Sequence, residues 1–235
     1  MSRLLFLQSV AFEYVGVMCL SAYVKRRGHQ CDIFIESEEG NSFFRKIREY
    51  QPDLVAFSAM TGFHRRYLQL AEKVKEMLEV PIVFGGPHAT HFPEMIDHPA
   101  VDAVCRGEGE EALADMLDAI GKGEDWSGIP NLWVKRNGAV IRNDIRCGEN
   151  LLNNYPPADR TIYYKYDYLR NYPTKPFITG RGCPYLCSFC FNRDFNQLYK
   201  GKMDILRRIS PEKVLAEIED CKAKYPLRKI FFNDD

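Results

Sequence analysis

The sequence predicts an α/β protein built on a parallel sheet. Along the first half of the chain, short apolar runs of strand length alternate with amphipathic stretches of helical period. Further on, another apolar run leads into a glycine-rich loop, and a capped helix and a last apolar run follow it. Strands that alternate with helices are joined by right-handed crossovers, which produce a parallel sheet covered on both faces.

The first region, residues 1–125, is expected to form a five-stranded doubly wound domain of the Rossmann or flavodoxin kind. RLLFLQS and DLVAFSA are continuous apolar runs, as strands buried on both faces require. The expected strands cover residues 3–9, 31–36, 53–59, 81–86 and 101–107, and the expected helices cover residues 14–27, 42–50, 65–78, 93–98 and 110–120.

A connecting region is expected over residues 126–174. NLWVKRNGAVIRN (131–143) predicts a hairpin, because Asn137-Gly138 between two β-rich runs is a strong type I′ turn signal. The stretch 148–174 has no clear period but is rich in tyrosine and proline, so we expect it to pack between domains rather than to form a flexible linker.

Residues 175–235 resemble the opening of a β/α barrel. Residues 175–183 are expected to form an apolar strand that runs into a glycine-rich loop. A helix is expected over 210–224 after the N-cap Ser210, and a second strand over 228–235. Because a full eight-unit barrel needs about 250 residues, we expect this sequence to be a fragment of a longer protein whose barrel continues beyond it.

The composition is that of a soluble globular protein. Lys plus Arg number 32 and Asp plus Glu number 32, so the formal net charge is zero and gives no reason to expect a nucleic acid or anionic membrane as a partner. The sequence contains no apolar run of membrane-spanning length and no signal-peptide layout at its start, which predicts a cytoplasmic protein.

Three of the eight cysteines are clustered as Cys183, Cys187 and Cys190, with the spacing C-x-x-x-C-x-x-C. Thiolates this close on one loop can converge on a soft metal centre. A closed zinc site or a ferredoxin cluster needs four ligands, and no fourth Cys or His lies nearby. Three thiolates would leave one iron of a [4Fe–4S] cluster open for a substrate. Incidental cysteines, or a zinc site completed from a missing part of the protein, are the alternatives.

The stretch TGRGCPYLCSFC resembles the signature of the radical S-adenosylmethionine (radical SAM) superfamily. The resemblance implies a partial β/α barrel in which S-adenosylmethionine chelates the open iron and is cleaved reductively to a 5′-deoxyadenosyl radical. It also implies that the backbone around Phe189 contacts the adenine, and that an external one-electron reductant of the flavodoxin or ferredoxin type supplies the electron.

A second candidate site lies where strands of the first domain end. Ligands of doubly wound sheets bind beyond the carboxyl ends of the strands, at the point where the strand order reverses. The loops over 8–11, 58–61 and 85–90 should meet there, with the loop over 106–110 on the same edge. Paired glycines in the third loop let a ligand approach the backbone, but no loop has the G-x-G-x-x-G pattern of a dinucleotide site.

The stretches YVGVMCLSAYVKRRGH, VFGGPHATHFPE and VDAVCRGEGEEAL resemble the vitamin B12-binding domain that precedes many radical SAM barrels. The same stretches could also be ordinary strand–turn–helix junctions. The resemblance implies a bound cobalamin, and the residues expected to contact it are Ser9, Glu13, Ser58, Met60, Thr61, Gly85, Gly86, His88, Thr90, Gly107 and Glu108.

One departure from related B12 proteins is informative. B12 mutases carry a cobalt-ligating histidine in the pattern D-x-H-x-x-G, and in the matching register ending at Gly16 this sequence has Ala11 and Glu13 instead. A carboxylate is a poor ligand for the soft corrin cobalt. The resemblance therefore favours a cobalamin without a histidine ligand and argues against an isomerase.

The leading hypothesis is a cobalamin-dependent radical SAM enzyme that acts on a small molecule, either as a methyltransferase of an unactivated carbon or as an oxidative cyclase. The alternative is a cobalamin-binding module or sensor whose cluster loop is catalytically incomplete. A third hypothesis, a zinc-stabilised nucleotide-binding protein, predicts one tightly held zinc ion.

Overall fold

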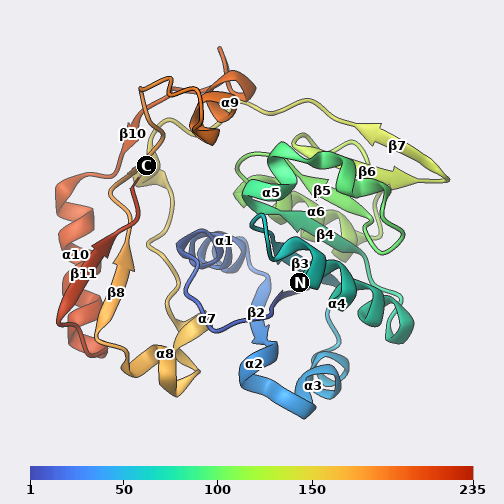
Figure 1. The fold of residues 1–235 in the computed structure, drawn as a ribbon, viewed down its shortest axis with the longest axis horizontal. Coiled ribbons are helices and arrows are strands. Elements are labelled where there is room, and N and C mark those ends of the chain that lie inside the picture. Colours follow the sequence, from blue (N-terminus) through green and yellow to red (C-terminus); the bar gives the residue numbers. More distant parts are fainter. Residues whose placement is uncertain (235) are drawn as a thin grey trace. The chain divides into compact units, whose positions relative to one another are not determined.

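The computed structural model describes residues 1–234 and divides the chain into two compact units (Figure 1). Unit 1 comprises Met1–Ala11 and Tyr23–Ile145, and unit 2 comprises Phe12–Ala22 and the described chain from Arg146 onward. These units differ from the domains expected over 1–125 and 175–235. The predicted hairpin continues the sheet of unit 1, whereas a short segment after the first strand packs into unit 2.

Unit 1 is organised around a seven-stranded sheet in the order β2-β1-β3-β4-β5-β6-β7. The strands β1 to β5 pair in parallel, which confirms the five-stranded doubly wound arrangement, with the order reversing between β1 and β3. The seven strands are β1 (Arg3–Gln8), β2 (Gln30–Ile35), β3 (Leu54–Ser58), β4 (Ile82–Gly85), β5 (Ala103–Cys105), β6 (Leu132–Arg136) and β7 (Ala139–Arg142).

The hairpin β6–β7 forms around the predicted turn, where Asn137 and Gly138 have φ values of +50° and +77°. The sequence did not indicate that this hairpin would extend the sheet. After the preceding helix the chain returns to the carboxyl edge, where the Arg106 backbone N–H donates to Asn131 O over 2.9 Å. For this reason β6 pairs antiparallel to β5.

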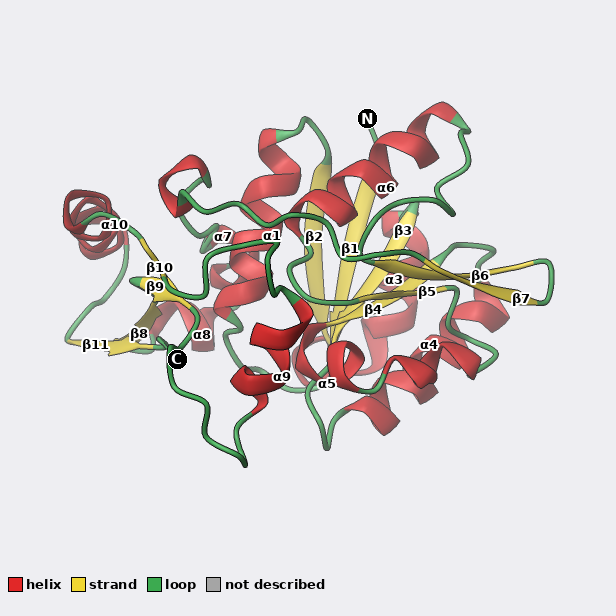
Figure 2. Cartoon of the chain, turned by 90° about the horizontal axis from the view of Figure 1, so that it is seen from above, coloured by secondary structure: helices red, strands yellow, loops and turns green. Residues whose placement is uncertain are grey.

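Helices cover both faces of the sheet, with α4 on one side and α6 on the other (Figure 2). The α4 face buries a continuous apolar core that includes Phe57, Phe84, Leu70 and Tyr67. The helical elements that begin in or belong to unit 1 are α2 (Glu36–Glu39), η1 (Gly40–Ser42), α3 (Phe43–Tyr50), α4 (His64–Met77), α5 (Gly86–His91), η2 (Pro93–Asp97) and α6 (Glu110–Lys122).

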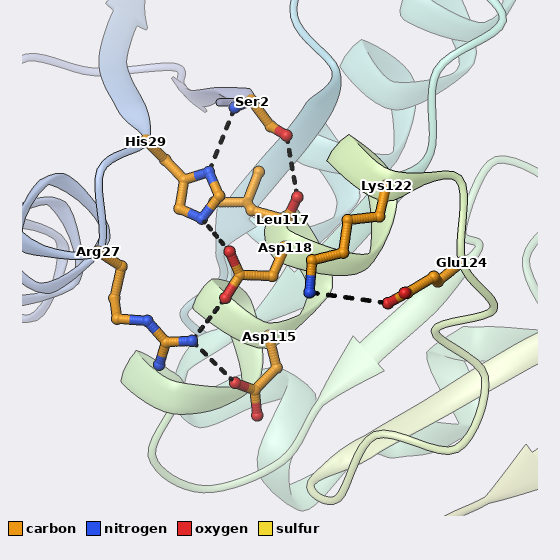
Figure 3. Close-up of polar contacts among 8 residues, drawn as sticks. All are labelled: Ser2, Arg27, His29, Asp115, Leu117, Asp118, Lys122 and Glu124. Carbon is orange, nitrogen blue, oxygen red and sulfur yellow. Dashed lines mark hydrogen bonds and ion pairs between the residues drawn. The ribbon is translucent and has the colours of Figure 1, made fainter.

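A polar cluster ties α6 to the turn before β2 (Figure 3). His29 is buried, and its Nδ1 accepts from the Ser2 backbone N–H over 3.2 Å. Its Nε2 therefore carries the proton and donates to Asp118 Oδ1 over 3.0 Å. Arg27 contacts the same carboxylate over 2.5 Å, and Ser2 Oγ donates to Leu117 O over 2.9 Å. These contacts hold the chain start and α6 together at the amino edge of the sheet.

Unit 2 contains the predicted strand–helix–strand unit. β8 (Thr174–Phe177) pairs in parallel with β11 (Lys229–Phe232) through α10 (Pro211–Lys224), and Ser210 Oγ caps α10 by accepting from Lys213 N over 3.4 Å. Its other elements are the first part of α1 (Val15–Arg26), η3 (Leu152–Asn154), α7 (Thr161–Tyr164), α8 (Asp167–Asn171), β9 (Gly180–Arg181), α9 (Phe191–Leu198) and β10 (Arg207–Arg208).

The apolar strand expected to run into a glycine-rich loop over 175–183 ends at Phe177. Asp234 Oδ1 accepts from the backbone N–H of Thr179 over 2.6 Å and from that of Gly180 over 3.3 Å, which takes these donors out of a strand ladder. The chain then starts β9, which pairs antiparallel with β10. Within the described residues, no helix is long and apolar enough to cross a membrane.

Candidate functional site

The loops that follow β3 and β4 lie together at the carboxyl edge of the sheet. Ala59 N donates to Gly85 O over 2.8 Å, and His88 N donates to Ala59 O over 2.9 Å. The loop after β5 joins them, because the Gly107 backbone N–H donates to Thr90 Oγ1 over 3.0 Å. The structure thus joins three of the four predicted loops, those after β3, β4 and β5, by hydrogen bonds.

Two adjacent glycines in this edge have different roles. Gly86 has a φ of +86°, and a Cβ there would lie 3.0 Å from both the N and the O of Ala59. The protein itself therefore requires glycine at this position. A Cβ at Gly85 would meet only Cys105, at 3.7 Å, which is ordinary contact. Packing of the described residues does not require glycine at 85, and the missing side chain leaves the backbone there open to close approach.

Within the GGPHAT stretch, Gly85 ends β4 and a helix begins at Gly86, so the residues form the strand–helix junction given as the alternative to a loop over 85–90. Helix α5 begins at Gly86 with Pro87 in its first turn, where a missing N–H costs nothing. The helix presents His88, which is 8% exposed, and its Nδ1 lies 3.1 Å from Thr61 Oγ1. The His88 ring stacks on His64 with centroids 3.9 Å apart. Burial lowers the pKa of His88, and the nearby His64 lowers it further, so a neutral imidazole is favoured.

His64 had no signal in the sequence beyond its place at the start of a predicted helix. It lies at the edge because α4 begins there, directly after the exposed loop over 60–63. Its ring covers one side of His88, and Phe92 lies near His88 with centroids 5.0 Å apart. The rings of His64, at the start of α4, His88, in α5, and Phe92, directly after α5, therefore form one aromatic group beside Thr61.

The edge fits a large amphipathic ligand such as cobalamin. Ser9 Oγ, after β1, is buried and has no hydrogen-bond partner among the described residues. Exposed apolar side chains surround the loops: Val10 is 38% exposed, Met60 42%, Phe63 39% and Phe92 53%. An unsatisfied polar atom and an apolar margin are what a buried corrin with amide side chains would complete.

The remaining predicted cobalamin contacts are spread over both units. Glu108 O accepts from Asn131 Nδ2 over 2.8 Å, so the loop after β5 is braced by the residue that precedes β6. Glu13 belongs to unit 2 and is 7% exposed. Its Oε2 accepts from Tyr164 Oη over 3.0 Å, and its Oε1 lies 4.0 Å from Lys175 Nζ. Glu13 thus faces groups of unit 2 that the sequence did not single out.

The three clustered cysteines lie on one open loop of unit 2. Cys187 is exposed and Cys183 and Cys190 are half-buried, while Phe189 is 92% exposed. Cys190 N donates to Cys187 O over 3.1 Å, and Asn196 Nδ2 donates to Cys183 O over 3.0 Å. In the part of the chain that the structure describes, no three His, Cys, Asp or Glu side chains are gathered into a metal-binding group. The donor types fit a thiolate-bound iron cluster, but the sulfurs are not drawn together.

The glycines that flank the loop permit a close backbone approach. A Cβ on Gly182 would lie 1.8 Å from Ile205 O, and one on Gly180 would lie 2.6 Å from Arg207 O. The segment that contains β10 therefore packs directly on the strand that enters the cysteine loop. The glycines noted in the sequence as flanking residues are thus required by the fold of unit 2.

Comparison with known proteins matches residues 11–117 to the B12 binding domain family. An uncharacterised methyltransferase of Pyrococcus horikoshii is 33% identical over 200 residues, which cover 80% of this chain and 41% of the relative. A cobalamin-dependent radical SAM methyltransferase of Streptomyces tokunonensis is 31% identical, with 78% of this chain and 27% of the relative covered. An anaerobic magnesium-protoporphyrin IX monomethyl ester cyclase of Rubrivivax gelatinosus is 27% identical, with 86% and 38% covered.

The chain thus spans less than half the length of these curated relatives. Solved structures agree in fold. The cobalamin-dependent S-adenosylmethionine radical enzyme OxsB, with aqua-cobalamin and S-adenosylmethionine bound, gives a TM-score of 0.81 at 18% identity, covering 100% of this chain and 34% of that one. The radical S-adenosylmethionine methyltransferase TsrM of Kitasatospora setae gives 0.78 at 17% identity, covering 100% and 48%. The match over residues 11–117 identifies a B12-binding domain in this chain, and the relatives of the chain include a cobalamin-dependent radical SAM methyltransferase.

Proposed function

We propose that this chain is part of a cobalamin-dependent radical SAM enzyme that transfers a methyl group to an unactivated carbon of a small molecule. The observation that carries the proposal is the pairing of a B12-binding domain with the loop of Cys183, Cys187 and Cys190 on a barrel-type strand–helix–strand unit. When bound, the cluster supplies the electron that cleaves S-adenosylmethionine, and the cobalamin supplies the methyl carrier.

The cysteine loop would hold the cluster through its three thiolates and leave one iron to S-adenosylmethionine. An exposed loop suits this role, because an external one-electron reductant and S-adenosylmethionine must both reach it. The 92% exposed Phe189 is free to pack against the adenine once the loop is ordered by iron. Ordering of this kind is expected where metal binding and folding are coupled.

The cobalamin would lie on the carboxyl edge of the sheet in unit 1. The backbone at Gly85 is open to close approach, and Ser9 Oγ offers a hydrogen bond that no described group uses. The neutral imidazole of His88, held by Thr61, would face the ligand without adding charge to it. Methyl transfer is favoured over oxidative cyclisation because the two relatives above 30% identity carry methyltransferase names, while the cyclase relative is 27% identical.

Anaerobic reconstitution of the full chain with iron, sulfide and hydroxocobalamin tests the proposal. We expect the broad absorbance of a [4Fe–4S] cluster, one corrin per chain, and formation of 5′-deoxyadenosine when S-adenosylmethionine and a reductant are added. The variant with Cys183, Cys187 and Cys190 all replaced by Ala should lose the iron and keep the corrin. Cys147→Ala is the matched control, because Cys147 is an exposed cysteine outside the loop.

The outcomes separate the candidate functions. Corrin binding without a cluster or without cleavage of S-adenosylmethionine would indicate a cobalamin-binding module. One tightly held zinc ion and no brown colour would indicate a zinc-stabilised protein. Absence of both corrin and iron–sulfur absorbance would refute the proposed function.

A further inference from the structure

A largely buried polar cluster in unit 2 includes Glu13. The cluster consists of Glu13, Arg160, Tyr164, Lys175 and Glu217. All of these side chains except that of Glu217 are buried. Lys175 is fully buried, Glu13 is 7% exposed and Arg160 is 6% exposed. Charged side chains are seldom buried unless they are paired, so each of these charges is expected to have a partner inside the unit.

The Glu13 carboxylate is engaged at both oxygens. Tyr164 Oη donates to Oε2 over 3.0 Å, and Lys175 Nζ lies 4.0 Å from Oε1. Lys175 in turn donates to Leu169 O over 2.7 Å and to Arg170 O over 3.0 Å. Its ammonium also lies 4.0 Å from the centroid of the Tyr164 ring. Glu13 is therefore built into a network and is not presented to a ligand.

Arg160 continues the network toward α10. Its Nη2 donates to Glu217 Oε1 over 2.7 Å and to Pro176 O over 2.8 Å, and its guanidinium lies 4.0 Å from the centroid of the Phe177 ring. The cluster thus contains two carboxylates and two cations and is neutral as a whole. Burial raises the pKa of Glu13 and lowers the pKa of Lys175, so each charge depends on the other for its place inside the unit.

A second contact fixes the same segment a little further along. Ser21 Oγ donates to Asp159 Oδ2 over 2.6 Å, and Asp159 N donates to Met18 O over 3.1 Å. The segment Phe12–Ala22 is thereby held to the aromatic stretch of unit 2 near both of its ends. Two independent attachments explain why a segment inside the matched B12-binding range belongs to unit 2.

We propose that Glu13 is a positioning residue, whose carboxylate fixes the start of the segment Phe12–Ala22 on β8, the strand that precedes β9 and the cysteine loop. Along the chain, Glu13 comes directly after the loop that follows β1 and contains Ser9, a residue of the proposed cobalamin edge. Its partner Lys175 lies on β8, and from β8 the chain continues through Gly180 and Gly182 to Cys183. The proposal rests on the proposed function for the role of these two loops, but not for the anchor itself.

Amide hydrogen exchange of the full chain tests the anchor. Glu13→Gln should speed exchange in unit 2 peptides that contain Tyr164 or Phe177 by about 10- to 100-fold, the effect of leaving a buried charge without its partner. Peptides of β3 and β4 in unit 1 should not change. Glu38→Gln is the matched control, since Glu38 is exposed. Adding Lys175→Met to Glu13→Gln should restore part of the protection, because the uncompensated charge is then gone.

A spectroscopic measurement separates the anchor from a cobalamin contact. Protein with Glu13→His is loaded with hydroxocobalamin, reduced to the cobalt(II) state, and compared with wild type by electron paramagnetic resonance. We expect the same spectrum, because the side chain at position 13 points into unit 2. Nitrogen splitting that appears in the variant but not in wild type, or unchanged exchange in Glu13→Gln, would overturn the proposal. If wild type binds no corrin, the proposed function fails, while the exchange measurement still decides on the anchor.

Discussion

Replacement of Gly182 by alanine is the most direct test of how the fold supports the cysteine loop. Gly182 precedes Cys183 and has a φ of +89°, a backbone conformation that side chains rarely adopt. A Cβ there would lie 1.8 Å from Ile205 O and 3.0 Å from Ile205 C. Both atoms are backbone, so the obstacle cannot be removed by a rotamer change.

The size of the effect follows from two separate contributions. The positive φ costs an alanine about 1–2 kcal/mol. In addition, the segment that contains Ile205 has to move away, which disrupts the pairing of β10 with β9 at Arg207 and Arg208. Each backbone hydrogen bond lost there costs about 1 kcal/mol. We therefore expect Gly182→Ala to destabilise this part of unit 2 by about 2–4 kcal/mol.

Two further glycines separate these contributions. Gly201 has a φ of +74° with nothing within 4 Å of its Cβ position, so Gly201→Ala carries the conformational cost alone. Gly180 lacks a positive φ, but its Cβ would lie 2.6 Å from Arg207 O, so Gly180→Ala carries the steric cost alone. Hydrogen-exchange protection of the peptide over 205–209 measures the opening free energy, and iron content after reconstitution measures the consequence for the loop.

The order expected is a large loss of protection for Gly182→Ala, an intermediate loss for Gly180→Ala and a small one for Gly201→Ala. Iron content should fall for the first two and stay near wild type for Gly201→Ala. Equal protection in Gly182→Ala and Gly201→Ala would refute the reasoning, because the contact with Ile205 would then contribute nothing.

Three other predictions concern the cobalamin edge, acid stability and a helix cap. Gly86→Ala should weaken hydroxocobalamin binding at least tenfold by distorting the loop after β3, and Gly85→Ala should also weaken it, because a Cβ there would obstruct the approach of the ligand to the backbone. Gly123→Ala, at a φ of +69° with nothing within 4 Å, is the control in an absorbance titration, because Gly123 follows α6. Burial alone would raise the pKa of Asp118, but the hydrogen bond and charge of Arg27 and the hydrogen bond from His29 hold that pKa below its ordinary value. The stabilisation from ionised Asp118 is therefore present at neutral pH and is lost as the pH falls through the lowered pKa. Asp118→Asn should reduce the free energy of unfolding by about 0.5–1 kcal/mol at pH 7 and should be as stable as wild type in acid. Urea unfolding at several pH values measures this difference. Ser210→Ala should destabilise α10 by about 0.5–1 kcal/mol, seen as faster exchange in its first turn, and no change there would contradict the cap.

Much of the candidate site at the sheet edge could be predicted because local patterns determine it. Continuous apolar runs identify parallel strands, and the strand order then decides which loops share an edge. The loops at Ser58, Gly85 and Gly107 meet as predicted. The helix starting at Gly86 was predicted only as the alternative, a strand–turn–helix junction, since a six-residue helix that opens with Gly-Pro has little periodic signal.

The sequence by itself determined the five-stranded doubly wound domain, the hairpin turn at Asn137-Gly138, the cap at Ser210 and the spacing of the three cysteines. These depend on short stretches whose side-chain pattern, turn residues or covalent spacing act locally. Only the tertiary structure decided the surroundings of Glu13, the stacking of His64 on His88 and the close approach of Ile205 to Gly182. Each of these joins residues from separate elements, and the burial that makes a charge or a glycine necessary exists only once those elements have packed together.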